Sequence, residues 1–388
     1  MKSKIHYFQF VKKISMSKTT KILTISIMSC MIFNACKKEK KEVLKPSTSN
    51  SIPEFYSSTE KITPAFTVIA GINSSISEPQ DLDFNPTRPG ELWVINKGTE
   101  ASGGSTVMFS NVGTPQQTSD YRKDGNAWHF MSLPSAISFS NTGDWATSAN
   151  VLDANHQGGS FTGPTLWSGD LNIYAKYAGP GTNGSHLDML HGSPYSMGIE
   201  SEKGNTYWVF DGYNQHIVRY DFNSDHGPGH DDHSDGKIHR YTDVSVTKNP
   251  SVPSHLVLDK DKKWLYIVDG GSKRILRMDI TTGEKLSSLP EINEPLGEHW
   301  EMTDVVWEVV LPSSFGLKQP CGIDTKDGRL FISDYETGEI ICIDIAGKSE
   351  IGRINTGKPG IMGIKIGPDG KLWYVNSTSN KVFRVDPI

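Results

Sequence analysis

The sequence predicts an all-β protein, a six-bladed β-propeller, because one short unit of strands and turns recurs along the chain. Three copies superpose almost without gaps: PYSMGIESEKGNTYWVFDGYNQHIVRYDF, PSHLVLDKDKKWLYIVDGGSKRILRMDI and PCGIDTKDGRLFISDYETGEIICIDI. Each combines short apolar strands with polar turns, the period-two pattern of consecutive antiparallel strands. A fourth copy, IMGIKIGPDGKLWYVNSTSNKVFRVDPI, ends the chain, and two degenerate copies begin at PQDLDFNPTRPGELWVIN and PSAISFSNTGDWATSAN. Six repeats of one supersecondary unit indicate a propeller.

The second strand of every copy ends in a residue with a short acceptor side chain. These residues are Asn96, Asn150, Asp211, Asp269, Asp334 and Asn376. Such side chains hydrogen-bond the backbone of a following turn, so we expect a structural ring. The last copy stops after its third strand, whereas residues 66–70 (FTVIA) form an unclaimed strand before the first copy. We expect this N-terminal strand to complete the sixth blade and close the propeller.

The N-terminal segment predicts export rather than fold. Lys18 and Lys21 precede an apolar run over residues 22–33, which ends shortly before Ala35 and Cys36. The run is too short to span a bilayer, and its layout resembles a lipoprotein signal peptide that begins at either Met1 or Met16. We therefore predict acylation of Cys36 after cleavage. A plain secretory signal, or a fortuitous cysteine, is the alternative.

Three regions follow: a lipoprotein signal peptide over residues 1–35, a flexible tether over 36–61 and the propeller over 62–388. The tether is charged and then rich in Ser, Thr and Pro, so it cannot bury enough apolar area to order itself. The predicted location is the bacterial cell envelope, periplasm-facing or at the cell surface, with membrane contact through the lipid only. The net charge of -5 is spread along the chain and indicates no nucleic-acid partner.

Counting back from the Asp/Asn ring gives the residues expected to line the central channel. They are Asp81, Ala136, Met197, His255, Cys321 and Met362. A His, a Cys and two Met form a soft ligand set that suits copper(I) or, through His and thiolate, zinc. The alternative is an apolar plug. In an oxidising compartment Cys321 and Cys342 are either paired or free thiols.

Long insertions are expected on the same face as the channel mouth, where binding surfaces are built. They carry His129, His156, His186, His191 and the pair His299 and Trp300. This His- and Trp-rich face is predicted to hold a small molecule, a peptide, a protein or a metal. For a channel-face metal, His156 and His191 would complete the set of His255 and Cys321.

A second cluster of metal-ligand types lies in the segment DHGPGHDDHSDG. His226, His230, Asp232 and His233 are its candidate ligands, and Gly-Pro-Gly lets the loop fold back on itself as a cation site requires. By strand parity we expect this loop on the face opposite the channel mouth. The segment is either a structural metal loop, for zinc, copper or calcium, or a solvated polar turn.

The repeat resembles the NHL-repeat family of six-bladed propellers (NHL/TolB-like), through its pattern Pro-x-Gly-Ile followed by Asp-Gly-x-Leu-x-Ile/Val-x-Asp over nearly all of residues 62–388. That family includes lyases, lactonases and binding modules, so the resemblance implies fold more than activity. Gluconolactonase-like members hold a channel calcium with Glu, Asn and Asp. In this chain only Asp81 fits that chemistry.

A more distant resemblance is to the peptidylglycine amidating lyase propeller. Asp211-Gly212-Tyr213 is similar to the strand that bears the catalytic Tyr of that family, and Pro253-Ser254-His255 is similar to its zinc-His motif. The resemblance implies Tyr213 as acid/base and His255 as zinc ligand. However, Met197 and Cys321 stand at other channel His positions, and His216 stands where the family has Arg.

Two hypotheses therefore follow from the sequence. The first is an envelope-anchored propeller that acts as a binding or scaffold module through its His- and Trp-rich face. The alternative is a metal-dependent lyase or hydrolase, with His255 as the central ligand. No nucleophile elbow, P-loop or dinucleotide fingerprint points to another class of enzyme.

Overall fold

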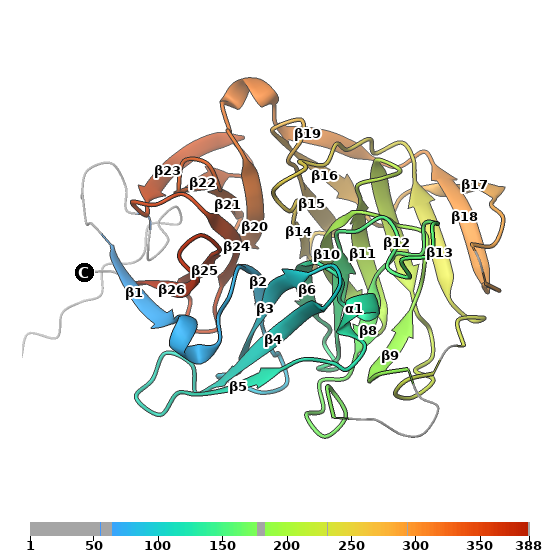
Figure 1. Ribbon diagram of the computed structural model, residues 1–388. Helices are drawn as coiled ribbons and strands as arrows, with labels where there is room; N and C mark the ends of the chain where they lie inside the picture. Colours follow the sequence, from blue (N-terminus) through green and yellow to red (C-terminus); the bar gives the residue numbers. More distant parts are fainter. Residues whose placement is uncertain (1–54, 56–63, 177–182, 231, 293, 387–388) are drawn as a thin grey trace, which may run out of the picture. The chain divides into compact units, whose positions relative to one another are not determined.

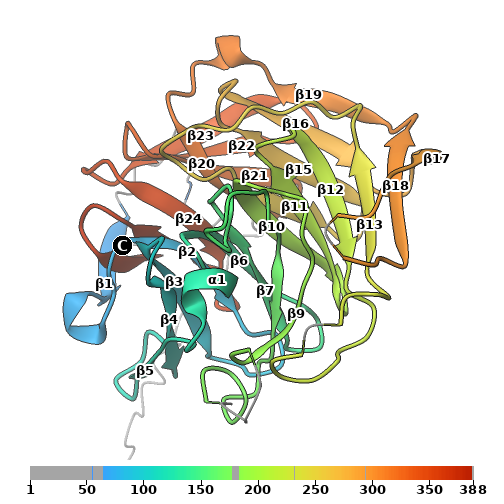
Figure 2. The same ribbon diagram turned by 45° about the vertical axis from the view of Figure 1, so that its right-hand side comes forward.

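The computed structural model describes residue 55 and residues 64–176, 183–230, 232–292 and 294–386, all within one compact unit that spans residues 48–388. The predicted signal peptide and the lipidation site Cys36 lie outside the described residues. Within them, no helix is long and apolar enough to cross a membrane. The described strands form six sheets, arranged as the blades of a β-propeller (Figures 1 and 2). The predicted fold class is therefore confirmed.

The first two blades are regular four-stranded antiparallel sheets. Blade one contains β2 (Pro79–Phe84), β3 (Leu92–Thr99), β4 (Gly103–Ser110) and β5 (Thr118–Arg122). Blade two contains β6 (Pro134–Phe139), β7 (Trp145–Ala149), β8 (Thr165–Trp167) and β9 (His186–Met189). Between them lies the short helix α1 (Ala127–Phe130), and 3-10 turns occur at Ile72–Ser74 and Ser313–Phe315.

Blades four to six repeat the same antiparallel order. Blade four contains β14 (Leu256–Asp259), β15 (Trp264–Asp269), β16 (Arg274–Asp279) and β19 (Trp307–Leu311). Blade five contains β20 (Pro320–Lys326), β21 (Arg329–Asp334), β22 (Glu339–Asp344) and β23 (Ser349–Asn355). Blade six contains β24 (Ile361–Ile366), β25 (Leu372–Asn376), β26 (Lys381–Asp386) and β1 (Ala65–Ala70).

The ring closes through β1, as the sequence predicts. Strand β1 runs antiparallel to β26, with Phe66 opposite Val385 and Val68 opposite Phe383. The hydroxyl of Thr67 donates a hydrogen bond to Asp386 at 2.6 Å. The N-terminal strand thus covers the edge that the C-terminal repeat would otherwise leave unpaired.

Blade three is larger than the sequence predicts. Besides β10 (Ser196–Lys203), β11 (Thr206–Asp211), β12 (His216–Asp221) and β13 (Lys237–Tyr241), it includes the hairpin β17 (Glu284–Ser288) and β18 (Glu298–Thr303). Strand β18 pairs in parallel with β13, so that His299 lies opposite Ile238 and Trp300 opposite His239. The prediction that His299 and Trp300 lie in a rim loop is therefore wrong, because the insertion forms a hairpin that extends a neighbouring blade.

The predicted Asp/Asn ring binds backbone, but not only in the following turn. Asp211 accepts from the backbone N–H groups of Tyr213 and Asn214, as expected. Asn96 and Asp269 instead accept from residues of the loops that enter their blades, Ser77 and Thr247. These side chains therefore fix turns on both sides of their strands.

The cores lie between the blades, and both cysteines belong to them. Cys321 and Cys342 are buried free thiols in the described structure, which excludes the disulfide alternative. A cluster of fully buried aromatic residues joins blades one and two: Trp93, Trp145, Trp167 and Tyr174.

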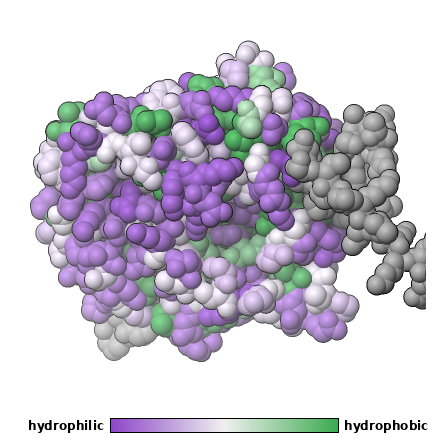
Figure 3. Space-filling model, turned by 180° about the vertical axis from the view of Figure 1, so that it is seen from behind, coloured by the Kyte–Doolittle hydropathy of each residue, from purple (hydrophilic) through white to green (hydrophobic). Residues whose placement is uncertain are grey.

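The face opposite to that of Figure 1 is mostly hydrophilic, with hydrophobic residues scattered over it (Figure 3).

Candidate functional site

The channel end nearest the predicted lining residues is tightly filled. Met197 and Cys321 are fully buried, and the Cys321 sulfur lies 3.6 Å from the sulfur of Met362. Glycines follow three of the lining residues and let neighbouring inner strands approach: a Cβ at Gly363 would collide with a carboxylate oxygen of Asp81. Burial raises the pKa of the Cys321 thiol well above its usual value, which disfavours the thiolate that binds metals. These contacts favour the plug interpretation.

His255 lies in the channel with its imidazole engaged. Its Nε2 donates to the Ser135 carbonyl at 2.9 Å, and its Nδ1 lies 3.6 Å from an Asp81 carboxylate oxygen. Among the described residues, the only group of three or more His, Cys, Asp or Glu donors close enough to hold a metal lies elsewhere. The structure thus brings His255 near Asp81 but not into a cluster with His156, His191 and Cys321.

Deeper in the channel, one lysine stands among acidic groups that the sequence analysis did not single out. The Lys365 ammonium lies 3.7 Å from carboxylate oxygens of both Asp83 and Glu200. Burial raises the pKa of Glu200 and Asp324. For Lys365, burial opposes the charge, but the surrounding carboxylates raise its pKa well above the usual value. The ammonium of Lys365 therefore balances the negative charge of the carboxylates in the channel.

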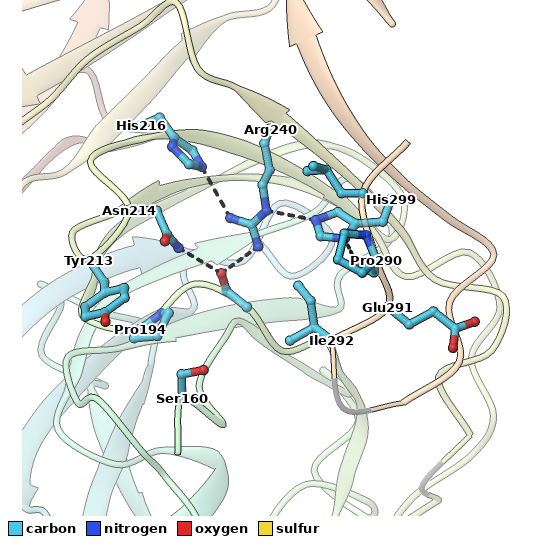
Figure 4. Close-up of a pocket in the computed structure, with 12 residues that line it drawn as sticks. Ser160, Pro194, Tyr213, Asn214, His216, Arg240, Pro290, Glu291, Ile292 and His299 are labelled. Atoms are coloured by element: carbon cyan, nitrogen blue, oxygen red, sulfur yellow. Dashed lines mark hydrogen bonds between the residues drawn. The ribbon is translucent and has the colours of Figure 1, made fainter. Parts of the chain in front are cut away.

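A cleft lies on blade three, beside the hairpin insertion. It has a volume of about 420 Å³ and is lined by Ser160, Gly192, Pro194, Tyr213, Asn214, His216, Arg240, Leu289, Pro290, Glu291, Ile292 and His299 (Figure 4). Arg240 comes from β13, His216 begins β12, and His299 comes from the parallel strand β18. The hairpin insertion therefore completes this cleft.

Arg240 is almost fully buried and forms the centre of the cleft (Figure 4). Its Nη1 donates to Asp211 Oδ2 at 3.1 Å, and its Nη2 donates to the carbonyl of Gly192 at 2.6 Å. Its Nε donates to His299 Nε2 at 2.9 Å, while Nη1 lies 3.3 Å from His216 Nε2. The charge of Arg240 is thus offset by a buried carboxylate, and its plane is fixed.

The two histidines that contact Arg240 are neutral at pH 7. Burial lowers the pKa of His216 to about 4 and lowers the pKa of His299 below its usual value. Each ring can then accept from the guanidinium, and His299 Nδ1 donates in turn to the Pro290 carbonyl at 2.6 Å. The cleft therefore combines a fixed cation with neutral, polarisable rings.

The other predicted rim histidines have partners of their own, although Trp128 contacts both His129 and His156 through their rings. His129 donates to the Ala154 carbonyl at 3.1 Å, and His186 stacks on Phe130 with ring centroids 3.6 Å apart. Burial lowers the pKa of His186 to about 3. His156 is partly exposed, with its Nδ1 3.6 Å from a carboxylate oxygen of Glu100.

Tyr213, the predicted acid/base, lies at the mouth of the Arg240 cleft with 55% of its surface exposed.

The acidic loop is connected to the rim through residues that the sequence analysis missed. His233 Nδ1 lies 2.6 Å from Asp188 Oδ1, and Glu294 joins His191 (2.6 Å) to His233 (3.5 Å). His226 pairs with Asp235 at 3.0 Å. Of the four predicted loop ligands, His226 and His233 thus join this network, whereas His230 and Asp232 are exposed. Asp188, His226 and Asp235 bring one metal-ligand atom each within 4.8 Å of one another.

Comparison with known proteins bears on the fold. No family model matches the sequence, and no curated protein matches it. Among solved structures, an auxiliary nutrient binding protein from Bacteroides ovatus ATCC 8483 aligns with a TM-score of 0.55 and 10% identity, covering 84% of this chain and 78% of its own. A luciferin-regenerating enzyme aligns with a TM-score of 0.53 and 12% identity. The calcium-binding protein regucalcin from Agrobacterium tumefaciens aligns with a TM-score of 0.50 and 12% identity. Both alignments cover 84% of this chain and 96% of the other chain. At these identities the likeness is one of fold: the chain shares the β-propeller architecture of these proteins.

Proposed function

We propose that this chain is an envelope-anchored binding propeller that holds a small, neutral, hydroxyl-rich molecule in the Arg240 cleft. The observation that carries the proposal is the buried guanidinium, held by Asp211 and flanked by two neutral histidines at the floor of an open cleft. Fixed polar groups on an otherwise apolar wall are typical of small-molecule sites.

The charge balance favours a neutral ligand over an anion. Asp211 offsets Arg240, and the acidic Glu291 also lines the cleft. Hydroxyl groups both donate and accept, so they match a lining of guanidinium, imidazole, amide and phenol groups. The exposed ring of Tyr213 offers a flat apolar surface on which a sugar ring can stack. Two solved structures that share the fold are auxiliary nutrient binding proteins from Bacteroides species, which supports a binding role.

The lyase or hydrolase alternative has less support. Tyr213 lines the Arg240 cleft, whereas His255 lies in the channel and is absent from the lining of that cleft. An acid/base and its metal must act on the same substrate atoms. The catalytic role of Tyr213 and the NHL-repeat assignment remain predictions from the resemblance.

Binding is tested by isothermal titration calorimetry of the full chain with a panel of monosaccharides, disaccharides and short-chain carboxylates. We expect at least one sugar to bind with a Kd of roughly 1–100 μM and the carboxylates not to bind. Replacing Tyr213→Ala removes the stacking surface and should weaken that binding by about tenfold, since a buried aromatic contact contributes roughly 1–2 kcal/mol.

The matched control is Tyr121→Ala, because Tyr121 is similarly exposed (50%) but lies on β5 of blade one. It should leave the Kd unchanged. Binding of a carboxylate in preference to every sugar would contradict the neutral ligand. Equal effects of the two tyrosine variants would contradict the location.

Anchoring is a separate part of the proposal and depends on Cys36. If its thiol is acylated, Cys36→Ser should remove the lipid and release the protein from the membrane fraction. Phase partitioning with a detergent, followed by immunoblotting, measures the change. Cys30→Ser is the control, since this cysteine lies inside the predicted signal peptide. A Cys36→Ser variant that partitions like the parent would contradict the lipobox assignment.

A further inference from the structure

A cluster of metal-ligand side chains lies away from the Arg240 cleft, where blades two and three meet. Asp188 belongs to β9 of blade two, whereas His226 and Asp235 belong to the segment between β12 and β13 of blade three. One ligand atom from each residue lies within 4.8 Å of the other two. His226 Nε2 and Asp235 Oδ1 are 3.0 Å apart, close to the separation of two ligands that each lie about 2.1 Å from one ion.

A second, independent observation concerns the other oxygen of Asp188. Oδ1 accepts from the backbone of Met189 and lies 2.6 Å from His233 Nδ1, but Oδ2 has no hydrogen-bond partner among the described residues. The Asp188 side chain is fully buried, with 0% of its surface exposed. A buried carboxylate oxygen without a partner is costly, and a cation is the kind of ligand that removes this cost.

From this geometry we infer that Asp188, His226 and Asp235 bind a divalent transition-metal ion of the zinc class. One imidazole and two carboxylates suit such an ion, whereas calcium prefers six or more oxygen ligands. Water would fill the remaining position. The site does not depend on the proposed sugar-binding cleft.

His233 acts in this arrangement as a positioning residue rather than a ligand. Its imidazole lies between Asp188 Oδ1 and the carboxylate of Glu294, so it orients the Asp188 carboxylate. A ligating carboxylate held by a hydrogen bond in this way is typical of metal sites. The bound ion would link His226 and Asp235 to blade two, where the backbone N–H of Gly229 already donates to the His186 carbonyl at 2.7 Å.

The test is isothermal titration of the full chain, dialysed against a chelator, with zinc chloride and separately with calcium chloride. We expect one zinc ion per chain with a Kd below about 1 μM, and weaker binding of calcium. Asp188→Asn should weaken zinc binding by roughly 100-fold, and cobalt(II) added to the parent chain should show the visible absorption of a nitrogen- and oxygen-ligated ion. Asp235→Asn, at a more exposed ligand, serves if Asp188→Asn does not fold.

The matched control is His230→Gln, since His230 is an exposed histidine of the same loop outside the group of three donors. It should keep the parent Kd. Absence of stoichiometric zinc binding, equal losses in His230→Gln and Asp188→Asn, or tighter binding of calcium than of zinc would each overturn the inference.

Discussion

Deletion of residues 66–70 is expected to abolish cooperative folding, although the deleted segment lies at the opposite end of the chain from the C-terminal repeat that it completes. The deletion removes nearly all of β1 and leaves β26 as an unpaired edge. It also removes the edge-to-face contact between Phe66 and Tyr374, whose ring centroids are 6.5 Å apart. Strand β1 is the outer strand of blade six and joins the N-terminal end of the chain to the C-terminal repeat. Its removal therefore costs the ladder, the packing and the ring closure together, on the order of the whole 5–15 kcal/mol stability of a domain.

Thermal unfolding followed by circular dichroism measures this effect. The deletion variant should show no cooperative transition, whereas Val68→Thr, at a residue with 50% of its surface exposed on the same strand, should melt within a few degrees of the parent. A deletion of equal length from the predicted tether, residues 40–44, should also melt like the parent. A cooperative transition in the 66–70 deletion would contradict closure by β1.

The blades were predictable because each repeat carries its own periodicity and turn residues. The hairpin of β17 and β18 was not, since its partner β13 lies more than forty residues away and parallel pairing leaves no local pattern. Because the hairpin was not predicted, the burial of Arg240 beneath it was not predicted either. Arg240 shares a face of β13 with the buried Ile238, and β18 and its neighbouring loop cover it.

Some residues of the candidate sites were likewise predictable from the repeat, and others were not. Tyr213 and His216 lie beside a repeat turn, so their position followed from the ring of Asp and Asn residues. Asp188 and Glu294 contact His233 from blade two and from the hairpin insertion, and no spacing in the sequence connects those segments. The sequence does contain a pattern that indicates the charged channel. The inner strands of three copies read MGIE, CGID and MGIK, and each of these three ends in a charged residue at the same position.

Lys365→Met is expected to lower the free energy of unfolding by roughly 3–5 kcal/mol, the cost of removing one partner from a buried ionic group. The side chain of Lys365 is only 15% exposed, and its ammonium lies between Asp83 and Glu200. Methionine keeps the length and apolar character of the side chain but leaves these carboxylates without their cation. Denaturation by urea measures the change, and Lys358→Met, at an exposed lysine just before β24, should change stability by less than about 0.5 kcal/mol.

The pH dependence separates loss of the charge from loss of packing. Burial already raises the pKa of Asp81, Glu200 and Asp324 in the parent, and removing the ammonium raises these pKa values further. A carboxyl group with a raised pKa binds its proton more readily in the folded state than in the unfolded state. Its contribution is therefore favourable below the unfolded pKa of about 4 and is lost as the pH rises through the folded pKa. The stability deficit of Lys365→Met should consequently be largest near pH 8 and shrink toward pH 5. A deficit of equal size at both pH values would show that Lys365 acts through packing alone.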